Sequence, residues 1–177
     1  MEFNILYWIQ GLRSEFLDMA MSTVFDKIVG SIGQIWIVIG VILLIFKKTR
    51  RTGICVLAAY GLSFLLGDTV LKHLVARPRP CALDETVALI VKRPTSFSFP
   101  SVHTAFAFSA ATVIAHSHKK AAVWVFLAAA LIGFSRMYFF VHFPSDVLAG
   151  LVLGVLIGIA VNAVADALVR RIRAKAQ

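Results

Sequence analysis

Cysteine and acidic side chains are both scarce in this sequence. Its two cysteines, Cys55 and Cys81, show no metal-ligand spacing, and Cys55 lies inside an apolar block, so we expect no disulfide framework. Only nine Asp and Glu residues stand against eighteen Lys and Arg residues, and no carboxylate cluster is suited to Mg²⁺. A P-loop is missing as well. We therefore expect a functional site with no metal and no cofactor.

The sequence also lacks the alternation of apolar and polar residues that marks membrane β-strands, which favours helices. Its first residues, "MEFNILYWIQGLRSEF", have neither a basic n-region nor a small-residue cleavage site, so we expect no signal peptide. No linker and no internal repeat is visible. The natural prediction is a single membrane-embedded domain over residues 1–177.

Apolar residues are abundant instead. They make up 59% of the chain, whose mean hydropathy is +0.85, against about 45–50% in a typical soluble domain. They fall in blocks long enough for helices that cross the roughly 30 Å of membrane hydrocarbon. The predicted spans are residues 28–46, 53–71, 101–115, 121–141 and 144–168. The fold class is therefore all-α, a polytopic transmembrane helical bundle.

The N-terminal segment is less apolar than these spans. Five of its residues could share one helical face, and three charged residues would interrupt a crossing. The apolar set is Leu6, Ile9, Phe16, Ala20 and Val24; the charged set is Arg13, Glu15 and Asp18. Residues 1–26 are thus predicted to form an amphipathic helix in the membrane interface. A sixth crossing remains the alternative, so the bundle has five or six helices.

Basic residues set the expected orientation. The segments "KKTRR" (47–51), "HSHKK" (116–120) and "RRIRAK" (170–175) hold ten of the eighteen Lys and Arg residues. Alternating spans place all three on one side, which should be the cytoplasm. The net charge of +9 therefore serves topology, and no nucleic-acid partner is expected. The oligomeric state stays open.

Six more basic residues fall on the opposite side: Lys72, Arg77, Arg79, Lys92, Arg93 and Arg136. Loop solvation is a sufficient explanation for Arg77, Lys92 and Arg93. Lys72 ends the second span, and Pro78 and Pro80 force an extended path that can turn Arg79 back toward it. Lysine and the planar guanidinium of arginine both suit phosphate oxygens. The alternative is that both are snorkelling anchors at a helix end.

The stretch "SFPSVHTAFAF" (96–106) places a histidine at the start of an apolar span. Ser101 is a good N-cap, and the free N–H groups and positive dipole of a helix N-terminus favour an anion. The Ser101 hydroxyl and the N–H groups of Val102 and His103 are predicted to point at that anion. His103 would then reach the group bonded to it, unless it is only an interfacial histidine.

The stretch "SRMYFFVHFPSD" (135–146) supplies the remaining groups. Arg136 lies near the outer end of the fourth span, where a charge needs a partner or a cavity. His142 precedes the fifth span, and Asp146 in its first turn can reach back to the imidazole. A carboxylate on one ring nitrogen leaves the other free as a nucleophile. A structural Asp–His pair is the alternative. Together the three pieces suit phosphoryl transfer, which needs positioning and charge stabilisation.

These residues resemble the signature of the type 2 phosphatidic acid phosphatase superfamily of membrane lipid phosphatases. That signature is Lys, six residues, Arg-Pro; then Pro-Ser-Gly-His; then Ser-Arg, five residues, His, three residues, Asp. Matching positions are Lys72, Arg79, Pro80, "PSVH" (100–103), Ser135, Arg136, His142 and Asp146. Val102 departs from the usual glycine, and its branched side chain would crowd a backbone that needs φ > 0.

The resemblance implies a metal-independent lipid phosphatase. In it, His142 attacks phosphorus to give a phosphohistidine, Asp146 stabilises the imidazolium, and His103 protonates the leaving lipid oxygen. Phosphate-binding residues would be Lys72, Arg79, Ser101, Val102 and Arg136. An outward-facing site in the plasma membrane favours undecaprenyl diphosphate, with phosphatidylglycerol phosphate and phosphatidic acid as alternatives. A non-enzymatic lipid transporter or scramblase is the rival class, and vanadate-dependent haloperoxidase chemistry is disfavoured because those enzymes are soluble.

Overall fold

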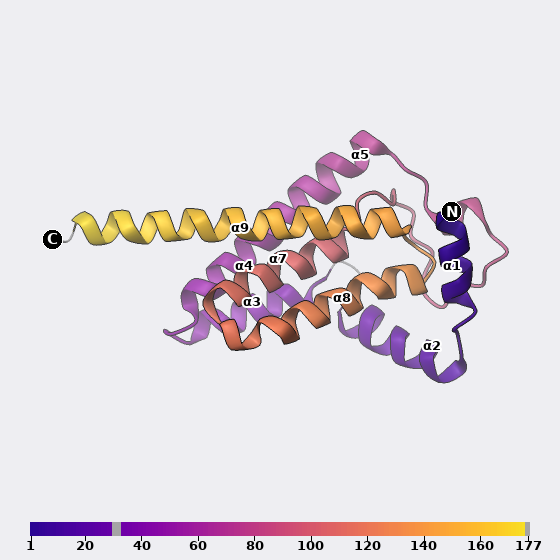
Figure 1. Ribbon diagram of the computed structural model, residues 1–177, viewed down its shortest axis with the longest axis horizontal. Helices are drawn as coiled ribbons and strands as arrows, with labels where there is room; N and C mark the ends of the chain where they lie inside the picture. Colours follow the sequence, from indigo (N-terminus) through magenta and orange to yellow (C-terminus); the bar gives the residue numbers. More distant parts are fainter. Residues whose placement is uncertain (30–32, 176–177) are drawn as a thin grey trace.

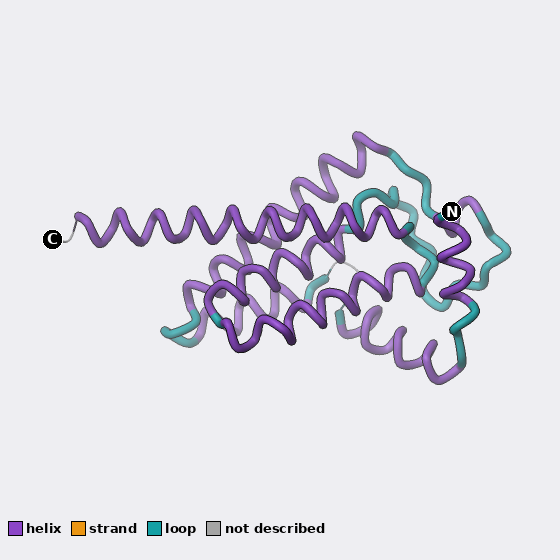
Figure 2. Tube along the Cα trace, viewed as in Figure 1, coloured by secondary structure: helices purple, strands orange, loops and turns teal. Residues whose placement is uncertain are grey.

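A computed structural model describes residues 1–29 and 33–175. Over these ranges the chain is helical with connecting loops and contains no strand, which confirms the all-α prediction (Figure 2). Most helices run side by side along the long axis of the molecule, and α1 lies across one end of it (Figure 1). That end also gathers the loop after α5 and the start of α9.

The N-terminal segment is two helices, where the sequence predicted one. α1 spans Glu2–Gln10 and α2 spans Glu15–Met21, continued by a π-helical stretch, η1, over Ser22–Ile28. The break occurs because Ser14 caps α2, its hydroxyl accepting from the N–H of Leu17 at 3.3 Å. The five apolar residues therefore do not lie on one continuous helix: Leu6 is buried within the protein, whereas Phe16 on the next helix is 72% exposed.

The five predicted spans correspond to helices, with shifted ends. Residues 30–32 of the first predicted span lie outside the described residues, and α3 covers Ile35–Ile45. α4 (Arg50–Ser63), η2 (Phe64–Leu71) and α5 (Lys72–Val75) form one continuous helix, and a short α6 follows at Pro80–Leu83. The rest are α7 (Val102–Ser117), η3 (Lys119–Ala121), α8 (Ala122–Tyr138) and α9 (Pro144–Lys175).

Length and hydropathy make three helical stretches of the described chain candidate membrane spans: Arg50–Leu83, Lys119–Tyr138 and Pro144–Lys175. α7 has 16 residues, which gives it a length of about 24 Å at 1.5 Å per residue. It is the central helix, packed against α4, α8 and α9. Its burial inside the protein explains why it need not match the full thickness of the hydrocarbon.

A row of glycines on α9 brings that helix against α7. A Cβ atom at Gly150 would overlap the carbonyl oxygen of Ser101. A Cβ atom at Gly154 would lie 2.5 Å from the carbonyl oxygen of Ala105. A Cβ atom at Gly158 would lie 2.5 Å from the Cβ atom of Thr112 on α7. Spacing of four residues between small side chains lets helix backbones approach closely. This contact fixes the N-terminus of α7 relative to the start of α9, where the candidate site residues lie.

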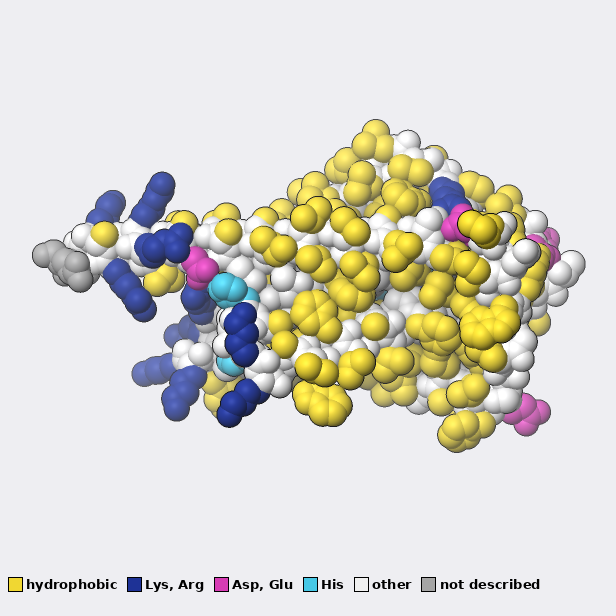
Figure 3. All heavy atoms as spheres, viewed as in Figure 1, with side chains coloured by type: hydrophobic (Ala, Val, Ile, Leu, Met, Phe, Trp, Pro, Cys, Tyr) yellow, Lys and Arg dark blue, Asp and Glu magenta, His cyan; other side chains and the backbone are white. Residues whose placement is uncertain are grey.

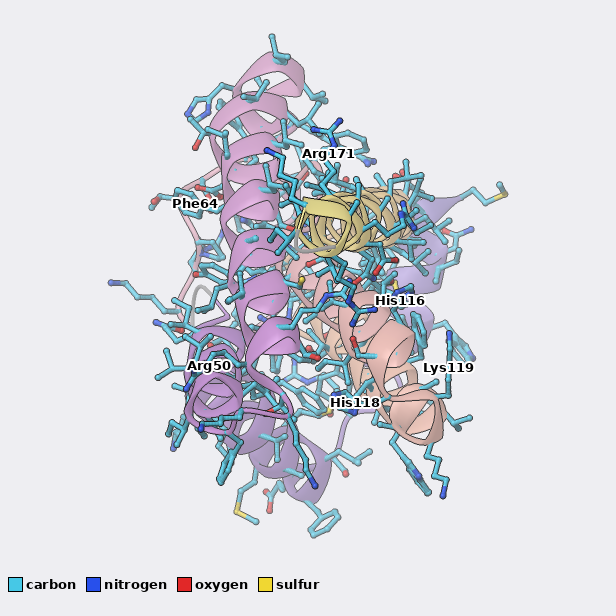
Figure 4. All side chains as sticks on the ribbon, turned by 90° about the vertical axis from the view of Figure 1, so that its left-hand side faces the viewer. Arg50, Phe64, His116, His118, Lys119 and Arg171 are labelled. Carbon is cyan, nitrogen blue, oxygen red and sulfur yellow. The ribbon has the colours of Figure 1, made fainter. Side chains whose placement is uncertain are left out.

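The two ends of the bundle differ in charge. The three basic segments named above gather at the end where α9 projects (Figure 3), and Figure 4 shows Arg50, Lys119 and Arg171 around it on separate helices. Asp166 of α9 pairs there with Arg51 and, at 3.2 Å, with His116. Apolar side chains cover much of the visible body between the ends (Figure 3). The predicted gathering of these segments on one side is therefore seen in the fold.

Candidate active site

A cavity of about 440 Å³ opens at the end of the bundle opposite the basic segments. Among the residues that line it are six of the eight predicted site residues: Lys72, Arg79, Val102, His103, Arg136 and His142. The other two, Ser101 and Asp146, are fully buried next to it. Segments that are far apart in the sequence thus supply one site.

His142 lies in the tight connection between α8 and α9. The N–H groups of Val141 and His142 both donate to the carbonyl oxygen of Arg136, at 3.2 and 3.3 Å. Phe140 adopts a left-handed φ of 58°, a conformation that costs a non-glycine residue about 1–3 kcal/mol. Burial of its ring against Phe3 and Tyr7 of α1 offsets that strain. The N-terminal helix therefore braces the loop that carries His142.

The imidazole of His142 is held from both sides. Arg79 Nη1 lies 3.1 Å from Nε2. Because a guanidinium only donates, Nε2 must be the unprotonated nitrogen and Nδ1 carries the proton. Nδ1 faces Asp146 Oδ2 at 3.6 Å, an ionic contact longer than a hydrogen bond, and no hydrogen-bond acceptor for Nδ1 exists among the described residues.

The charge state of His142 follows from its burial. Its side chain is 3% exposed. Burial, together with the charges of Arg79 and Arg136, lowers the pKa of His142 to about 4, although Asp146 opposes the shift. The imidazole is consequently neutral at physiological pH, and the lone pair of Nε2, which accepts from Arg79, lies at a cavity that Lys72 and Arg136 also line. A neutral ring is the form that can act as a nucleophile.

Asp146 is fixed through both carboxylate oxygens. Oδ2 accepts from the N–H of Phe143 at 2.8 Å, and Oδ1 accepts from Arg77 Nη1 at 2.7 Å. Sequence analysis assigned Arg77 to loop solvation, and that assignment is wrong. The missed signal is the spacing of Arg77 and Arg79: residues two apart on an extended path share a face. Arg79 reaches His142 while Arg77 reaches Asp146.

The cations of the cavity are oriented mostly by neutral oxygens. Arg79 donates to the carbonyl oxygens of Ser96 and Val141, at 2.7 and 2.9 Å. Arg136 donates to the carbonyl oxygen of Phe25 at 2.8 Å and lies over the ring of Phe139. Such partners hold a guanidinium without cancelling its charge, which stays available to an anion.

Two carboxylates that sequence analysis did not single out also line the cavity, Asp26 and Asp68. Asp68 pairs with Lys72 one helical turn later. Lys72 therefore reaches the cavity already neutralised, unlike Arg79. An incoming anion must compete with Asp68 for that ammonium group.

Ser101 does not cap α7 with its side chain, as its residue type suggested. It occupies the N-cap position of α7, but its side chain makes no capping hydrogen bond. Its hydroxyl accepts instead from the hydroxyl of Thr104 at 2.9 Å, and its N–H donates to the carbonyl oxygen of Asp146 at 3.0 Å. The reason is burial, since Thr104 is enclosed and must place its hydroxyl proton. Ser101 thus ties α7 to α9 in this structure.

Val102 fits without backbone strain. It is the first residue of α7 and is not among the described residues with positive φ. Its side chain faces Gly67 of η2, where a Cβ atom would lie 3.3 Å from Val102 Cγ2. Missing bulk at Gly67 therefore makes room for the branched side chain. The expected crowding at this position is absent.

Comparison with known proteins identifies the family. The sequence model of the PAP2 superfamily matches residues 52–170, which contain all eight predicted site residues. The chain belongs to the PAP2 superfamily. A relative, the undecaprenyl-diphosphatase of Sulfolobus acidocaldarius, is 36% identical over 121 residues, which cover 68% of this chain and 58% of that protein.

Solved structures of similar proteins share the fold. The transmembrane PAP2-type phosphatidylglycerolphosphate phosphatase of Bacillus subtilis aligns with a TM-score of 0.74 at 28% identity, covering 92% of this chain and 83% of that one. LpxE of Aquifex aeolicus aligns with the same TM-score at 32% identity, covering 92% and 94%. These matches confirm the predicted transmembrane helical bundle and the predicted family.

Proposed function

We propose that this PAP2 protein is a membrane lipid phosphatase that uses His142 as its nucleophile. The observation that carries the proposal is the state of that ring: buried, neutral, with Nε2 at a cavity lined by Lys72, Arg79 and Arg136. A lone structural Asp–His pair would not need three cations around it. Family membership over residues 52–170 supports the same chemistry.

The proposed reaction has two steps. His142 Nε2 attacks phosphorus, the bond from phosphorus to the lipid oxygen breaks, and His103 supplies the proton that this oxygen takes. Asp146 stabilises the imidazolium of the resulting phosphohistidine. Water then gives a proton to His103 and attacks phosphorus, the bond from phosphorus to Nε2 breaks, phosphate leaves, and His142 returns to its neutral state. In the resting site Arg79 occupies Nε2, so the phosphoryl oxygens must draw Arg79 onto themselves before attack.

The mechanism uses the cations of the protein to stabilise the transferring phosphoryl group. The described part of the chain contains no group of three or more His, Cys, Asp and Glu residues that could hold a metal ion. Lys72, Arg79, Arg136 and backbone N–H groups near Val102 would bind the phosphoryl oxygens. We therefore expect turnover to persist in EDTA.

Undecaprenyl diphosphate is the proposed substrate. A relative named undecaprenyl-diphosphatase is 36% identical to this chain. The loop between Leu83 and Ser101 is also too short to form a large domain over the head group of the substrate. Phosphatidylglycerol phosphate is the second candidate, because the Bacillus subtilis phosphatase named for it shares the fold. Phosphatidic acid is a third. The basic segments at the opposite end favour a cavity that faces the outside of the plasma membrane.

The test is phosphate release by purified protein in detergent with these three lipids, with and without EDTA, and with His142→Gln as the matched control. We expect release from at least one lipid, favouring the diphosphate, and none from the variant. A scramblase would move lipid across vesicles without releasing phosphate and would not depend on His142. Equal release by wild type and variant would reject the assigned nucleophile.

A further inference from the structure

Arg77 lies between two carboxylates that come from distant parts of the chain. Its Nη1 donates to Asp146 Oδ1 at 2.7 Å, and its Nη2 donates to Glu2 Oε2 at 2.6 Å. The guanidinium also lies 4.0 Å from the ring centroid of Phe143. A planar fork with one carboxylate on each branch is held in a single orientation.

Glu2 continues the network to the start of α9. Its Oε1 accepts from both the N–H and the hydroxyl of Ser145, at 3.1 and 2.7 Å. Partial burial opposes ionisation of Glu2, but hydrogen bonds from Ser145 and Arg77 outweigh it and lower the pKa of Glu2. The residue is therefore anionic at neutral pH. α1 thereby anchors the turn of α9 that carries Asp146.

Arg77 is absent from the residues that line the cavity. Its side chain is 26% exposed, on the far side of a carboxylate that is fully buried. An effect of Arg77 on catalysis must then pass through the residues that it contacts beside the cavity: Asp146, Ser145, whose hydroxyl accepts from Nη1 at 2.6 Å, and Phe143. Of these, Asp146 is the one that faces the imidazole of His142. The two oxygens of that carboxylate are held by different groups, Phe143 N–H on Oδ2 and Arg77 on Oδ1. Rotation of the carboxylate would break both hydrogen bonds.

We propose that Arg77, anchored by Glu2, is a positioning residue that holds the Asp146 carboxylate with Oδ2 directed at His142 Nδ1. The inference rests on the proposed phosphatase function and adds the N-terminal helix to the machinery of the site. Without Arg77, Oδ1 would carry a buried charge with no cation beside it. The carboxylate would then rotate or take up a proton to recover a hydrogen-bond partner. Either change withdraws support from the imidazolium formed in the first step.

The experiment compares Arg77→Gln, Arg77→Lys, Glu2→Gln and the double variant Glu2→Gln/Arg77→Gln with wild type. Because misplacing a catalytic group costs about 100-fold in rate, we expect kcat of Arg77→Gln to fall by about that factor while KM stays within about twofold. Arg77→Lys keeps the charge and should recover about tenfold of this loss. Glu2→Gln should lower kcat by less than Arg77→Gln does. The double variant should have the same kcat as Arg77→Gln alone, because Glu2 acts through Arg77.

Arg13→Gln is the matched control. Arg13 also anchors the N-terminal segment, through Asp18 at 2.7 Å and the carbonyl oxygen of Ala88 at 2.8 Å, and makes no hydrogen bond to Asp146. Its kcat should stay within about twofold of wild type. An equal loss in Arg13→Gln and Arg77→Gln would show a merely structural role and overturn the proposal.

Other outcomes are also decisive. Wild-type kcat in Arg77→Gln, or a change confined to KM, would overturn the positioning role while leaving the phosphatase function intact. A wild-type protein that releases no phosphate from any lipid would instead overturn the proposed function. If Arg77→Gln does not fold, the test rests on Arg77→Lys and Glu2→Gln. A wild-type kcat in both variants would reject the inference, and a lower kcat in both at constant KM would support it.

Discussion

His142 is a residue whose charge depends on the fold. Its pKa of about 4 lies below the ordinary value of 6.5, so between these two pH values the unfolded chain binds a proton that the folded chain does not. The stability contributed by neutral His142 is complete above pH 6.5. It declines as pH falls through this window, by about 2 kcal/mol at about pH 5.

Thermal unfolding in detergent at about pH 7.5 and pH 5 checks this prediction. Glutamine does not titrate, so the unfolding midpoint of His142→Gln should fall less between the two pH values than that of wild type. Parallel losses in both proteins would contradict the assignment of this pH dependence to His142.

His103 carries a second prediction at the residue scale. It lines the same cavity as His142, and the proposal gives it the proton of the leaving group. His103→Ala should lower turnover of a lipid phosphate by about 100-fold or more, the usual contribution of a general acid. A substrate with an acidic leaving group needs no such proton, so its turnover should fall far less. Equal losses on both substrates would assign His103 a different role.

Individual residues also show where sequence reasoning ended. Lys72, Arg79, Val102, His103, Arg136 and His142 were found because each lies in a motif with fixed spacing, and the fold brings them to one cavity. Arg77 was missed although its spacing from Arg79 places both side chains on one face, because its partner Asp146 is 69 residues away in the sequence. The hydrogen bond of Ser101 to Thr104 depends on burial by neighbouring helices, which local capping preference does not contain.

The helices themselves were predictable where apolar blocks are long, and less so at their ends. Hydropathy located α4, α8 and α9, but not the break between α1 and α2, where a capping serine overrides a weak amphipathic pattern. Nor did hydropathy reveal the contact of α7 with α9. The three glycines on α9 form that contact, and it sets the distance between the histidine loop and the start of α7.

Gly150→Ala tests this contact at the scale of the element. The added Cβ would overlap the carbonyl oxygen of Ser101, so we expect overpacking to cost about 1–3 kcal/mol and to shift the N-terminus of α7. Activity should fall about tenfold or more because His103 moves with that helix.

Gly61→Ala is the control for this prediction, since a Cβ at Gly61 meets nothing within 4 Å. The unfolding midpoint of Gly61→Ala should be unchanged or slightly raised, because alanine is favoured over glycine in a helix by about 1 kcal/mol. Its kcat should be unchanged. Unaltered activity in Gly150→Ala would show that the α7–α9 contact does not position the site.

At the scale of the whole molecule, the charge asymmetry predicts sidedness. The basic segments and the cavity lie at opposite ends, so we expect the cavity to face outward. In a cysteine-free background, a water-soluble thiol reagent applied to intact cells should label Glu85→Cys, an exposed loop position, and spare Lys48→Cys. The opposite labelling pattern would place the site in the cytoplasm and exclude a lipid carrier of the outer leaflet as its substrate.

The central claim is that His142 receives the phosphoryl group. The direct measurement is to mix the purified protein with undecaprenyl diphosphate labelled in its terminal phosphate, quench during turnover under alkaline conditions that preserve phosphohistidine, and map the labelled peptide. The proposed mechanism predicts label on His142, none in His142→Gln, and labelled peptide that still forms in EDTA. Label on His103, or phosphate release with no labelled histidine at any time, would contradict it.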